Sequence, residues 1–285
     1  MTSQRIAFLD VDGTILEHGS VIAPSTVTAI RTARANGHLV YLSTGRSDGD
    51  VNPDVRAIGF DGAITCGGAY ATRGDELIVS HPMPRPAVER LVAYFEAHGL
   101  HYFLQSHEDV YASPGILAFA DEFVHRRQER RSEDLRRLGM AEDDVSDVAL
   151  HQYTDLAQAD FDAIAKAVFV SDRSDGLDRA QTDLGDTFHV IPGSMPMPGG
   201  SNGEIGMLGT TKGAAILEVL QLLDLDAADA VGIGDSWNDV EMFEVCGVSV
   251  AMGNADPELQ ARADRVTTGV LDDGVWNAFV ALGLV

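Results

Sequence analysis

Two aspartates near the start of the chain stand two residues apart, as Asp10 and Asp12 in a run that ends Gly13-Thr14. Carboxylates at this spacing can divide the work of catalysis, because one can stay ionised while the other gives up and recovers a proton. Gly13 allows the backbone to turn sharply beside them. Taken alone, however, an aspartate-rich run is more typical of a solvated turn.

Two further runs carry groups that can bind an anion. In the first, the Thr44 hydroxyl, backed by the backbone amide of Gly45, can hold a phosphoryl oxygen. In the second, Lys212 supplies a compact positive charge just before an expected helix, and the chain has only one other lysine, Lys166. Each also has a purely structural interpretation, since a threonine can cap a helix and a lysine can lie on the surface.

A fourth run, from Gly234 to Asp239, brings Asp235, Asn238 and Asp239 close together in sequence. Two aspartates four residues apart face the same way at the start of a helix. Carboxylate oxygens suit Mg²⁺, which takes one or two carboxylates together with water and a substrate phosphate. The alternative is that these acids only cap the positive end of a helix dipole.

The four runs can act together only if the fold brings them to one place. Both ends of the sequence alternate short apolar runs with helical patterns, which predicts a doubly wound, mainly parallel α/β sheet of the Rossmann-like kind. The carboxyl ends of parallel strands meet at one edge of such a sheet, so the four runs are expected to meet there. The predicted strands are Ile6–Leu9, His38–Ser43, Gly62–Cys66, Ala230–Ile233, Val248–Ala251 and Val266–Thr267, and the predicted helices are Ser25–Asn36, Glu241–Val245 and Val275–Leu282.

The middle of the chain has a different pattern. Prolines between His81 and Pro86 predict a linker, and a mixture of helical and strand-like segments follows. A second stretch rich in proline, glycine and serine, Pro192–Gly203, predicts the return linker. We therefore expect an inserted α+β cap domain of residues 84–204 within a core domain made of residues 1–83 and 205–285.

Composition narrows the class of protein. The 285 residues are 45% hydrophobic and 22% charged, which is typical of a soluble globular protein. The net charge of −24, from 20 basic and 44 acidic residues, argues against nucleic-acid and membrane partners. A protein this negative repels an anionic substrate unless local cations attract it, so a substrate of that kind would make a bound metal ion more expected.

Other features of the sequence bear on location and assembly. No apolar run reaches the ~18 residues of a membrane span, and the first strand begins too early for a signal peptide. The sequence therefore predicts a cytoplasmic protein in which Cys66 and Cys246 are reduced and buried. A monomer and a homodimer both stay open.

Together, the four runs resemble those of the haloacid dehalogenase superfamily. Within it the sequence is similar to the Cof-type, sugar-phosphatase-like hydrolases, which carry a large inserted cap. Three downstream segments, Ala251–Ala255, Ala263–Thr267 and Asp273–Val275, add to the resemblance. The cap segment matches only in size and position.

The resemblance implies a Mg²⁺-dependent phosphomonoester hydrolase of a small phosphorylated metabolite, with sugar phosphates ahead of phosphoglycosyl-glycerates, pyridoxal phosphate and nucleotides. Asp10 would be the nucleophile that forms an aspartyl phosphate, and Asp12 would be the general acid and base. The cap would close over the site and select the leaving group. The implied phosphate-binding residues are Thr44, Gly45, Lys212 and Asn238, and the implied Mg²⁺ ligands are Asp10, Asp12 through its backbone carbonyl, Asp235 and Asp239.

Two alternatives stay open. A phosphomutase of the phosphomannomutase type would share the same core residues and pass the phosphoryl group to a sugar hydroxyl. A non-catalytic phosphate-sensing protein could use the same fold, although the presence of Asp10, Asp12 and Lys212 together argues against it. Dehalogenation is poorly supported, because a haloacid needs no cluster of metal-binding carboxylates.

Overall fold

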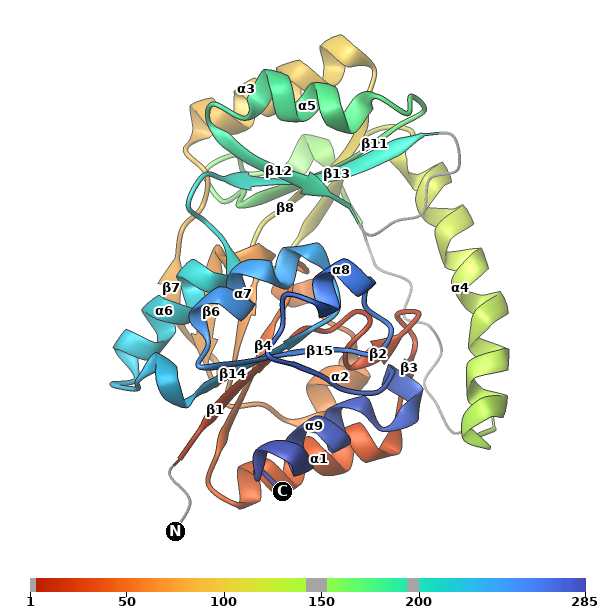
Figure 1. The fold of residues 1–285 in the computed structure, drawn as a ribbon. Coiled ribbons are helices and arrows are strands. Elements are labelled where there is room, and N and C mark those ends of the chain that lie inside the picture. The colour runs from red at the N-terminus through yellow and green to blue at the C-terminus, as the bar shows by residue number, and fades with distance from the viewer. Residues whose placement is uncertain (1–3, 142–152, 194–199) are drawn as a thin grey trace.

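The computed structural model describes residues 4–141, 153–193 and 200–285. The molecule has a lower part built on an eight-stranded sheet and an upper part built on a six-stranded sheet, and both chain ends lie in the lower part (Figure 1). We call the lower part the core and the upper part the cap.

The core sheet has the strand order β16-β15-β14-β1-β4-β5-β6-β7. The strands from β16 to β5 are parallel, and β6 and β7 extend the sheet in antiparallel fashion. A small hairpin of β2 and β3 follows the first strand. The bounds are β1 Ile6–Leu9, β2 Leu16–Glu17, β3 Val21–Ile22, β4 Leu39–Ser43, β5 Gly62–Thr65, β6 Tyr70–Arg73, β7 Glu76–Ser80, β14 Ala230–Gly234, β15 Val248–Ala251 and β16 Arg265–Val266.

Helices cover both faces of this sheet, because the core strands are apolar on both sides. In β1, Ala7 and Leu9 pack in the cluster under α1 and α9, whereas Ile6 and Phe8 pack in the cluster under α6 and α7. The predicted doubly wound α/β core is therefore confirmed. The helices are α1 Pro24–Ala35, α2 Pro53–Ile58, α6 Lys212–Leu222, α7 Val240–Val245, α8 Pro257–Gln260 and α9 Gly274–Leu282, with 3₁₀ turns at Asp48–Asp50, Cys66–Gly68, Ala227–Asp229, Trp237–Asp239 and Val270–Asp272.

The first strand occupies the position from which the sheet is wound in two directions. β1 lies between β14, from the end of the chain, and β4, the next long strand. In open α/β sheets ligands bind beyond the carboxyl ends of the strands at this switch point. Asp10, the residue after β1, therefore lies where such a fold places its site.

The cap sheet has the order β10-β9-β8-β11-β13-β12. Helices α3 and α5 lie on the side away from the core, and the long helix α4 runs down alongside both parts (Figure 1). On the opposite face, Phe103 and Val170 pack with Ile116 at the start of α4, and the rest of that face is turned toward the core. The bounds are α3 Arg85–His98, β8 His101–Gln105, β9 Val110–Ala112, α4 Ile116–Leu138, β10 Thr154–Asp155, a 3₁₀ turn Leu156–Gln158, β11 Lys166–Ser171, α5 Gly176–Leu184, β12 Phe188–Pro192 and β13 Ser201–Met207.

The return segment differs from the prediction. Pro192 ends strand β12, and the expected linker Pro192–Gly203 runs into β13, an inner strand that pairs with both β11 and β12. The linker prediction was wrong at both ends, and residues 194–199 lie outside the described part of the chain. Two neighbouring strands stabilise β13 although Ser201, Asn202 and Gly203 have low strand propensity. The expected boundary between residues 204 and 205 falls inside β13, so the cap strand continues to Met207.

Two smaller expectations can also be compared with the structure. Cys66 and Cys246 are both buried and free, as predicted. Within the described residues, every helix is too short or too polar to cross a membrane.

Candidate active site

The structure brings the chemically interesting runs to one edge of the core sheet. Asp10 follows β1, Thr44 follows β4 and Asp235 follows β14, while Lys212 begins α6. The Asp10 backbone N–H donates to the Ile233 carbonyl at 2.9 Å, which ties the end of β1 to the end of β14. The prediction that these runs meet is confirmed.

Lys212 is the buried centre of the arrangement, with 2% of its surface exposed. Its Nζ lies 2.6 Å from Asp10 Oδ1 and 2.6 Å from Asp239 Oδ1. A longer contact of 3.4 Å reaches Asn238 Oδ1. The alternative of a surface lysine is therefore excluded, since this ammonium is fixed against two buried carboxylates.

The site holds more negative charge than its own cations balance. Burial raises the pKa of Asp10 to about 7, although Lys212 opposes the shift. Burial, together with the charges of Asp10 and Asp239, raises the pKa of Asp235 to about 9. Burial would lower the pKa of Lys212, but the two carboxylates it contacts raise it above its ordinary value. A further cation would relieve the remaining repulsion among the carboxylates.

The loop after β14 is held by Asp239, which is fully buried. Its Oδ2 accepts the backbone N–H groups of Asp235 at 3.0 Å and Ser236 at 3.1 Å. Its other oxygen accepts from Lys212. Asp239 thus already has partners on both oxygens, so its clearest task is to position Lys212 and the Asp235 loop.

Asp12 takes part in a different interaction. Arg46 donates from Nε to Asp12 Oδ2 at 2.6 Å and from Nη2 to Asp12 Oδ1 at 2.8 Å. Burial would lower the pKa of Arg46, but Asp12 and Asp50 raise it, which keeps the guanidinium charged. The sequence motif contains Arg46, yet its role was missed; a basic residue directly after Thr44 and Gly45 was the available signal.

The predicted phosphate-binding residues form a connected group. Thr44 is 1% exposed, and its Oγ1 accepts the Arg46 backbone N–H at 3.2 Å. A Cβ placed on Gly45 would lie 3.8 Å from Asn238 Nδ2, so these two residues are neighbours. Asn238 in turn contacts Lys212. Gly45, Asn238 and Lys212 therefore lie next to one another beside Asp10, and Thr44 begins the loop that carries Gly45.

The carboxylates fit a Mg²⁺ ion. Oxygens of Asp10, Asp235 and Asp239 all lie within 4.8 Å of one another. Two of these groups have raised pKa values, which indicates that their negative charge lacks compensation. Hard carboxylate oxygens in an acidic, partly buried cluster are the donor set that Mg²⁺ prefers.

Gly13 makes room for Asp235. The backbone at Gly13 has φ of +86°, and a Cβ there would lie 2.1 Å from Asp235 Oδ2. Around this contact, Thr14 Oγ1 donates to Asp235 Oδ1 at 3.3 Å, and Asn254 Nδ2 donates to the Gly13 carbonyl at 2.8 Å. A glycine is required here both for the positive φ and for the close approach.

Replacing Gly13 by alanine is expected to displace Asp235 and weaken Mg²⁺ binding by at least about tenfold, because an oxygen of the expected ligand Asp235 must move. Gly37→Ala is the matched control: its φ is +91°, but a Cβ there would meet nothing within 4 Å. Both variants should lose roughly 1 kcal/mol of stability from backbone strain. Titration with Mg²⁺ and thermal unfolding of both variants test this, and equal metal affinity in the two would contradict the role assigned to Gly13.

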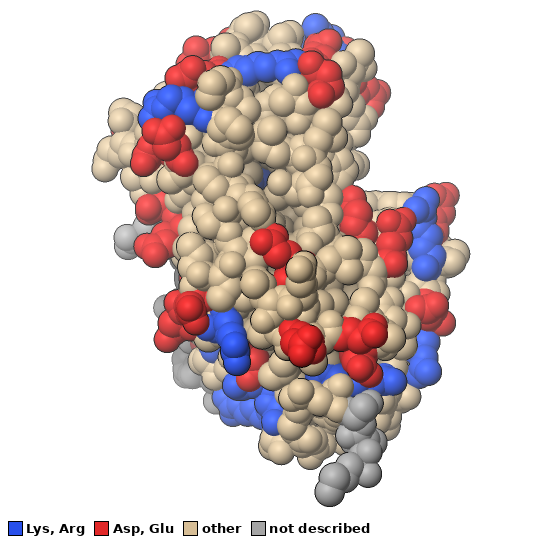
Figure 2. All heavy atoms as spheres, turned by 90° about the vertical axis from the view of Figure 1, so that its left-hand side faces the viewer, with Lys and Arg blue, Asp and Glu red and all other residues tan. Residues whose placement is uncertain are grey.

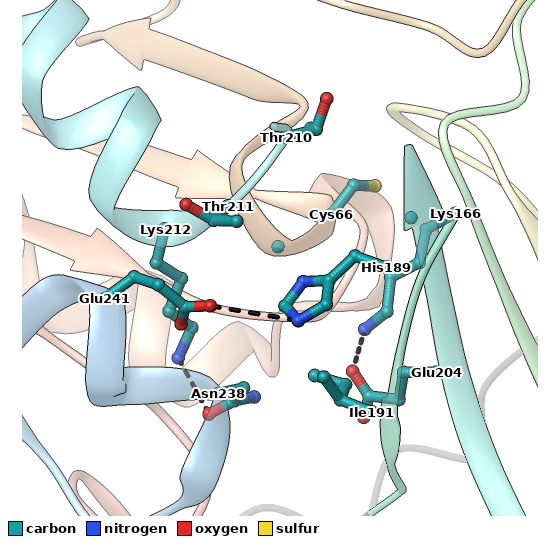
Figure 3. Close-up of a pocket in the computed structure, with 12 residues that line it drawn as sticks. Cys66, Lys166, His189, Ile191, Glu204, Thr210, Thr211, Lys212, Asn238 and Glu241 are labelled. Carbon is teal, nitrogen blue, oxygen red and sulfur yellow. Dashed lines mark hydrogen bonds and ion pairs between the residues drawn. The ribbon is translucent and has the colours of Figure 1, made fainter. Parts of the chain in front are cut away.

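A pocket extends from this edge of the core to the face of the cap sheet that is turned toward the core (Figure 3). Figure 2 shows a hollow between the two parts, with a basic side chain visible inside it. Lys212 lines the pocket from the core, and Lys166, the other lysine of the chain, lines it from β11 of the cap. The cap residues that line it are Lys166, His189, Ile191, Glu204 and Gly206.

These cap residues were missed by the sequence analysis. Strand alternation was the available signal, because residues two apart point to the same face. In β12, Phe188 and Val190 pack in the apolar cluster under the helices, whereas His189 and Ile191 line the pocket. A polar residue such as His189 between two buried apolar residues marks the face that looks toward the core.

Comparison with known proteins adds a family and a set of relatives. Residues 7–279 match the family of haloacid dehalogenase-like hydrolases. The Bacillus subtilis protein YkrA is 28% identical over 283 residues, which cover 99% of this chain and 98% of YkrA. The pyridoxal phosphate phosphatase YbhA of Escherichia coli is 25% identical over 93% of both chains. The 5-amino-6-(5-phospho-D-ribitylamino)uracil phosphatase YwtE of Bacillus subtilis is 27% identical over 94% of both.

Solved structures agree with the fold. A sugar phosphatase of haloacid dehalogenase subclass IIB, BT4131, superposes with a TM-score of 0.77 at 21% identity, covering 99% of this chain and 100% of BT4131. The structure of TM0651 from Thermotoga maritima superposes with a TM-score of 0.73 at 20% identity, covering 98% and 97%. At these identities the likeness concerns the fold, including the inserted cap.

Proposed function

Because this chain belongs to the haloacid dehalogenase-like hydrolases, and to their Cof-type branch, we propose that it is a Mg²⁺-dependent phosphatase of small phosphomonoesters. The observation that carries the proposal is the buried contact of Lys212 with Asp10 at the switch point of the sheet. An ammonium in that position can neutralise a phosphoryl oxygen next to a carboxylate nucleophile.

The reaction would begin at Asp10. Lys212 holds Asp10 Oδ1, so Oδ2 is the oxygen that attacks phosphorus. The bond from phosphorus to the leaving oxygen breaks, its electron pair goes to that oxygen, and Asp12 supplies the proton. The product is a phosphoryl group on Asp10 and a free alcohol, which splits one difficult displacement into two easier ones.

The second step would return the enzyme to its starting state. Asp12, now a carboxylate, takes a proton from a water molecule that attacks the phosphoryl group. The bond from phosphorus to Asp10 breaks, and inorganic phosphate leaves. Both Asp12 oxygens accept from Arg46, and this pair needs the ionised carboxylate that Asp12 carries between the two steps. Asp12 must leave the pair to take or supply a proton, so Arg46 is a positioning residue for the ionised form.

Mg²⁺ would be held by Asp10, Asp235 and the Asp12 backbone carbonyl, with Asp239 acting directly or through water. When bound, it would reduce the repulsion between the anionic nucleophile and the anionic substrate. Thr44, Gly45, Asn238 and Lys212 would bind the phosphoryl oxygens, since they border the region beside Asp10.

Sugar phosphates are the substrates that we propose first. Two of the three relatives named above are a pyridoxal phosphate phosphatase and a phosphatase of a phosphoribityl compound, and the fold neighbour BT4131 is a sugar phosphatase. Each name is that of a phosphatase of a small molecule. A phosphomutase would use the same core residues, so the acceptor of the phosphoryl group has to be measured.

A screen of phosphorylated metabolites with Mg²⁺ and phosphate detection tests the proposal. We expect free phosphate to be released from sugar phosphates without a bisphosphate activator. Turnover that isomerises a sugar phosphate without releasing phosphate would favour the phosphomutase. A purified, folded protein that releases phosphate from none of the metabolites, nor from an aryl phosphate, would contradict both.

Mg²⁺ binding is expected to become tighter as the pH rises toward about 9, because the metal competes with protons on Asp10 and Asp235. Their raised pKa values mean that the metal-free site carries protons near neutral pH, and binding must release them. Calorimetry in two buffers with different ionisation enthalpies measures this release directly. Heats that do not depend on the buffer, with a pH-independent affinity, would contradict the protonation assigned to the site.

A further inference from the structure

The cap contributes one tightly held ion pair to the pocket. Lys166 of β11 is paired with Glu204 of β13, and these side chains are 7% and 14% exposed. Lys166 Nζ also donates to the backbone carbonyl of Gly45 at 2.8 Å. The pair therefore lies directly against the loop that carries Thr44, on the side of the pocket away from Lys212 (Figure 3).

The charges around the pocket can be counted over the described residues that line it. Two are positive, Lys166 and Lys212, and two are negative, Glu204 and Glu241. Lys212 is committed to Asp10 and Asp239 and would serve the transferred phosphate. The part of the pocket that remains for the leaving group thus has one ammonium facing two carboxylates.

A second anionic group on the substrate would meet an unfavourable field in this part of the pocket. Lys166 already has Glu204 and the Gly45 carbonyl as partners, so an incoming carboxylate or phosphate would have to compete with Glu204 for it. Glu241 lies on the opposite wall, 3.9 Å from His189 Nε2. Because both carboxylates are partly shielded from water, their repulsion of an anion is only partly screened.

Uncharged hydroxyl groups fit the same walls well. Carboxylate oxygens of Glu204 and Glu241 accept hydrogen bonds from hydroxyl groups, and Thr210 and Asn238 offer further polar atoms. Among the cap residues that line the described pocket, only Ile191 has an apolar side chain and only Gly206 has none. The walls therefore suit a small, hydroxyl-rich group with no negative charge.

We propose that the Lys166–Glu204 pair determines specificity by admitting uncharged, hydroxyl-rich leaving groups and rejecting those with a second anionic group. This inference rests on the proposed phosphatase activity and deepens it. Lys166 holds Glu204 in place and partly offsets its charge, and Glu204 supplies both a hydrogen-bond acceptor for hydroxyl groups and the repulsion of anions.

The test uses two substrates that differ in one group: glycerol 1-phosphate, with an uncharged end, and 3-phosphoglycerate, with a carboxylate in its place. Wild-type protein should favour glycerol 1-phosphate in kcat/KM by at least about fivefold, as expected for one unfavourable charge contact. Glu204→Gln should lower this ratio of kcat/KM values toward one, because it removes the charge that repels the carboxylate. Lys166→Met should raise the same ratio, because it leaves the negative charge of Glu204 without its positive partner.

The two variants are expected to change the ratio of kcat/KM values in opposite directions. Damage to the fold would instead lower kcat/KM for both substrates alike and leave the ratio unchanged. Glu218→Gln is the matched control, since it removes one charge from an exposed pair with His81 on the outer side of α6. Its ratio should equal that of wild type, which excludes an effect of the overall charge of −24.

A wild-type ratio near one, or a ratio that both variants leave unchanged, overturns the inference. If the ratio behaves as expected, the inference is supported. Hydrolysis of an aryl phosphate serves as an independent measurement of the proposed function. Phosphate release from neither the two substrates nor the aryl phosphate overturns the phosphatase proposal, whereas phosphate release with an unchanged ratio overturns only the specificity.

Discussion

Replacement of Asp10 by asparagine is expected to lower phosphatase kcat by more than about 10⁴-fold, the scale seen when a nucleophile is removed from an enzyme. Asparagine keeps the shape of aspartate and its Oδ1 can still accept from Lys212, but its amide nitrogen cannot attack phosphorus. The measurement is the rate of phosphate release from an aryl phosphate with saturating Mg²⁺.

The stability of the Asp10→Asn variant should equal that of wild type or exceed it. The pKa of Asp10 is raised to about 7, so its ionised form is disfavoured by the folded protein at higher pH. Removing that charge should therefore leave the melting temperature at alkaline pH equal to that of wild type or above it. A matched control is Asp162→Asn, which breaks an exposed pair with Arg85 in the cap and should keep wild-type activity. Wild-type turnover in the Asp10→Asn protein would contradict the role of Asp10 as the nucleophile.

Replacement of Lys212 by methionine is expected to have the second-largest effect, on both rate and stability. The rate should fall by roughly 10³-fold, because a preorganised positive charge beside the transferring phosphoryl group is lost. Stability should fall by about 3–5 kcal/mol, since breaking a buried ion pair leaves Asp239 without its partner at an exposure of 0%.

Lys212→Arg provides the sharper comparison for the same position. Lys212 is 2% exposed and reaches Asp10 and Asp239 with a single nitrogen. The larger, planar guanidinium of arginine cannot occupy that space without shifting one carboxylate, so the charge alone should not restore activity. Kinetics and urea unfolding of both variants give the answer. Full activity in Lys212→Arg would show that any cation suffices and would contradict the geometry assigned to this ammonium.

The sequence was sufficient to predict the core and the meeting of its motifs. Strand β1 is apolar on both faces, so its four residues Ile6–Leu9 predict a buried parallel strand, and Asp10 must then lie at its carboxyl end. The same argument placed Thr44 and Asp235 after β4 and β14. Local pattern is enough in these cases because a parallel strand buried on both sides has a strong signal.

Contacts between distant segments could not be predicted in the same way. Arg46 and Asp12 are 34 residues apart, and only the fold shows that they pair. Lys166 of the cap and the carbonyl of Gly45, in the loop after β4 of the core, are 121 residues apart. The first three residues of strand β13 were predicted to end a linker, because they favour turns and only pairing with β11 and β12 makes them a strand.

The central claim is that a phosphoryl group is carried on Asp10, and trapping that species tests it most directly. Wild-type protein turning over an aryl phosphate with Mg²⁺ is treated with borohydride, which reduces an aspartyl phosphate to homoserine, and the peptides are then sequenced by mass spectrometry. The account predicts homoserine at position 10 in a substrate-dependent manner. Unmodified Asp10 throughout active turnover, or modification at another carboxylate in its place, would contradict it.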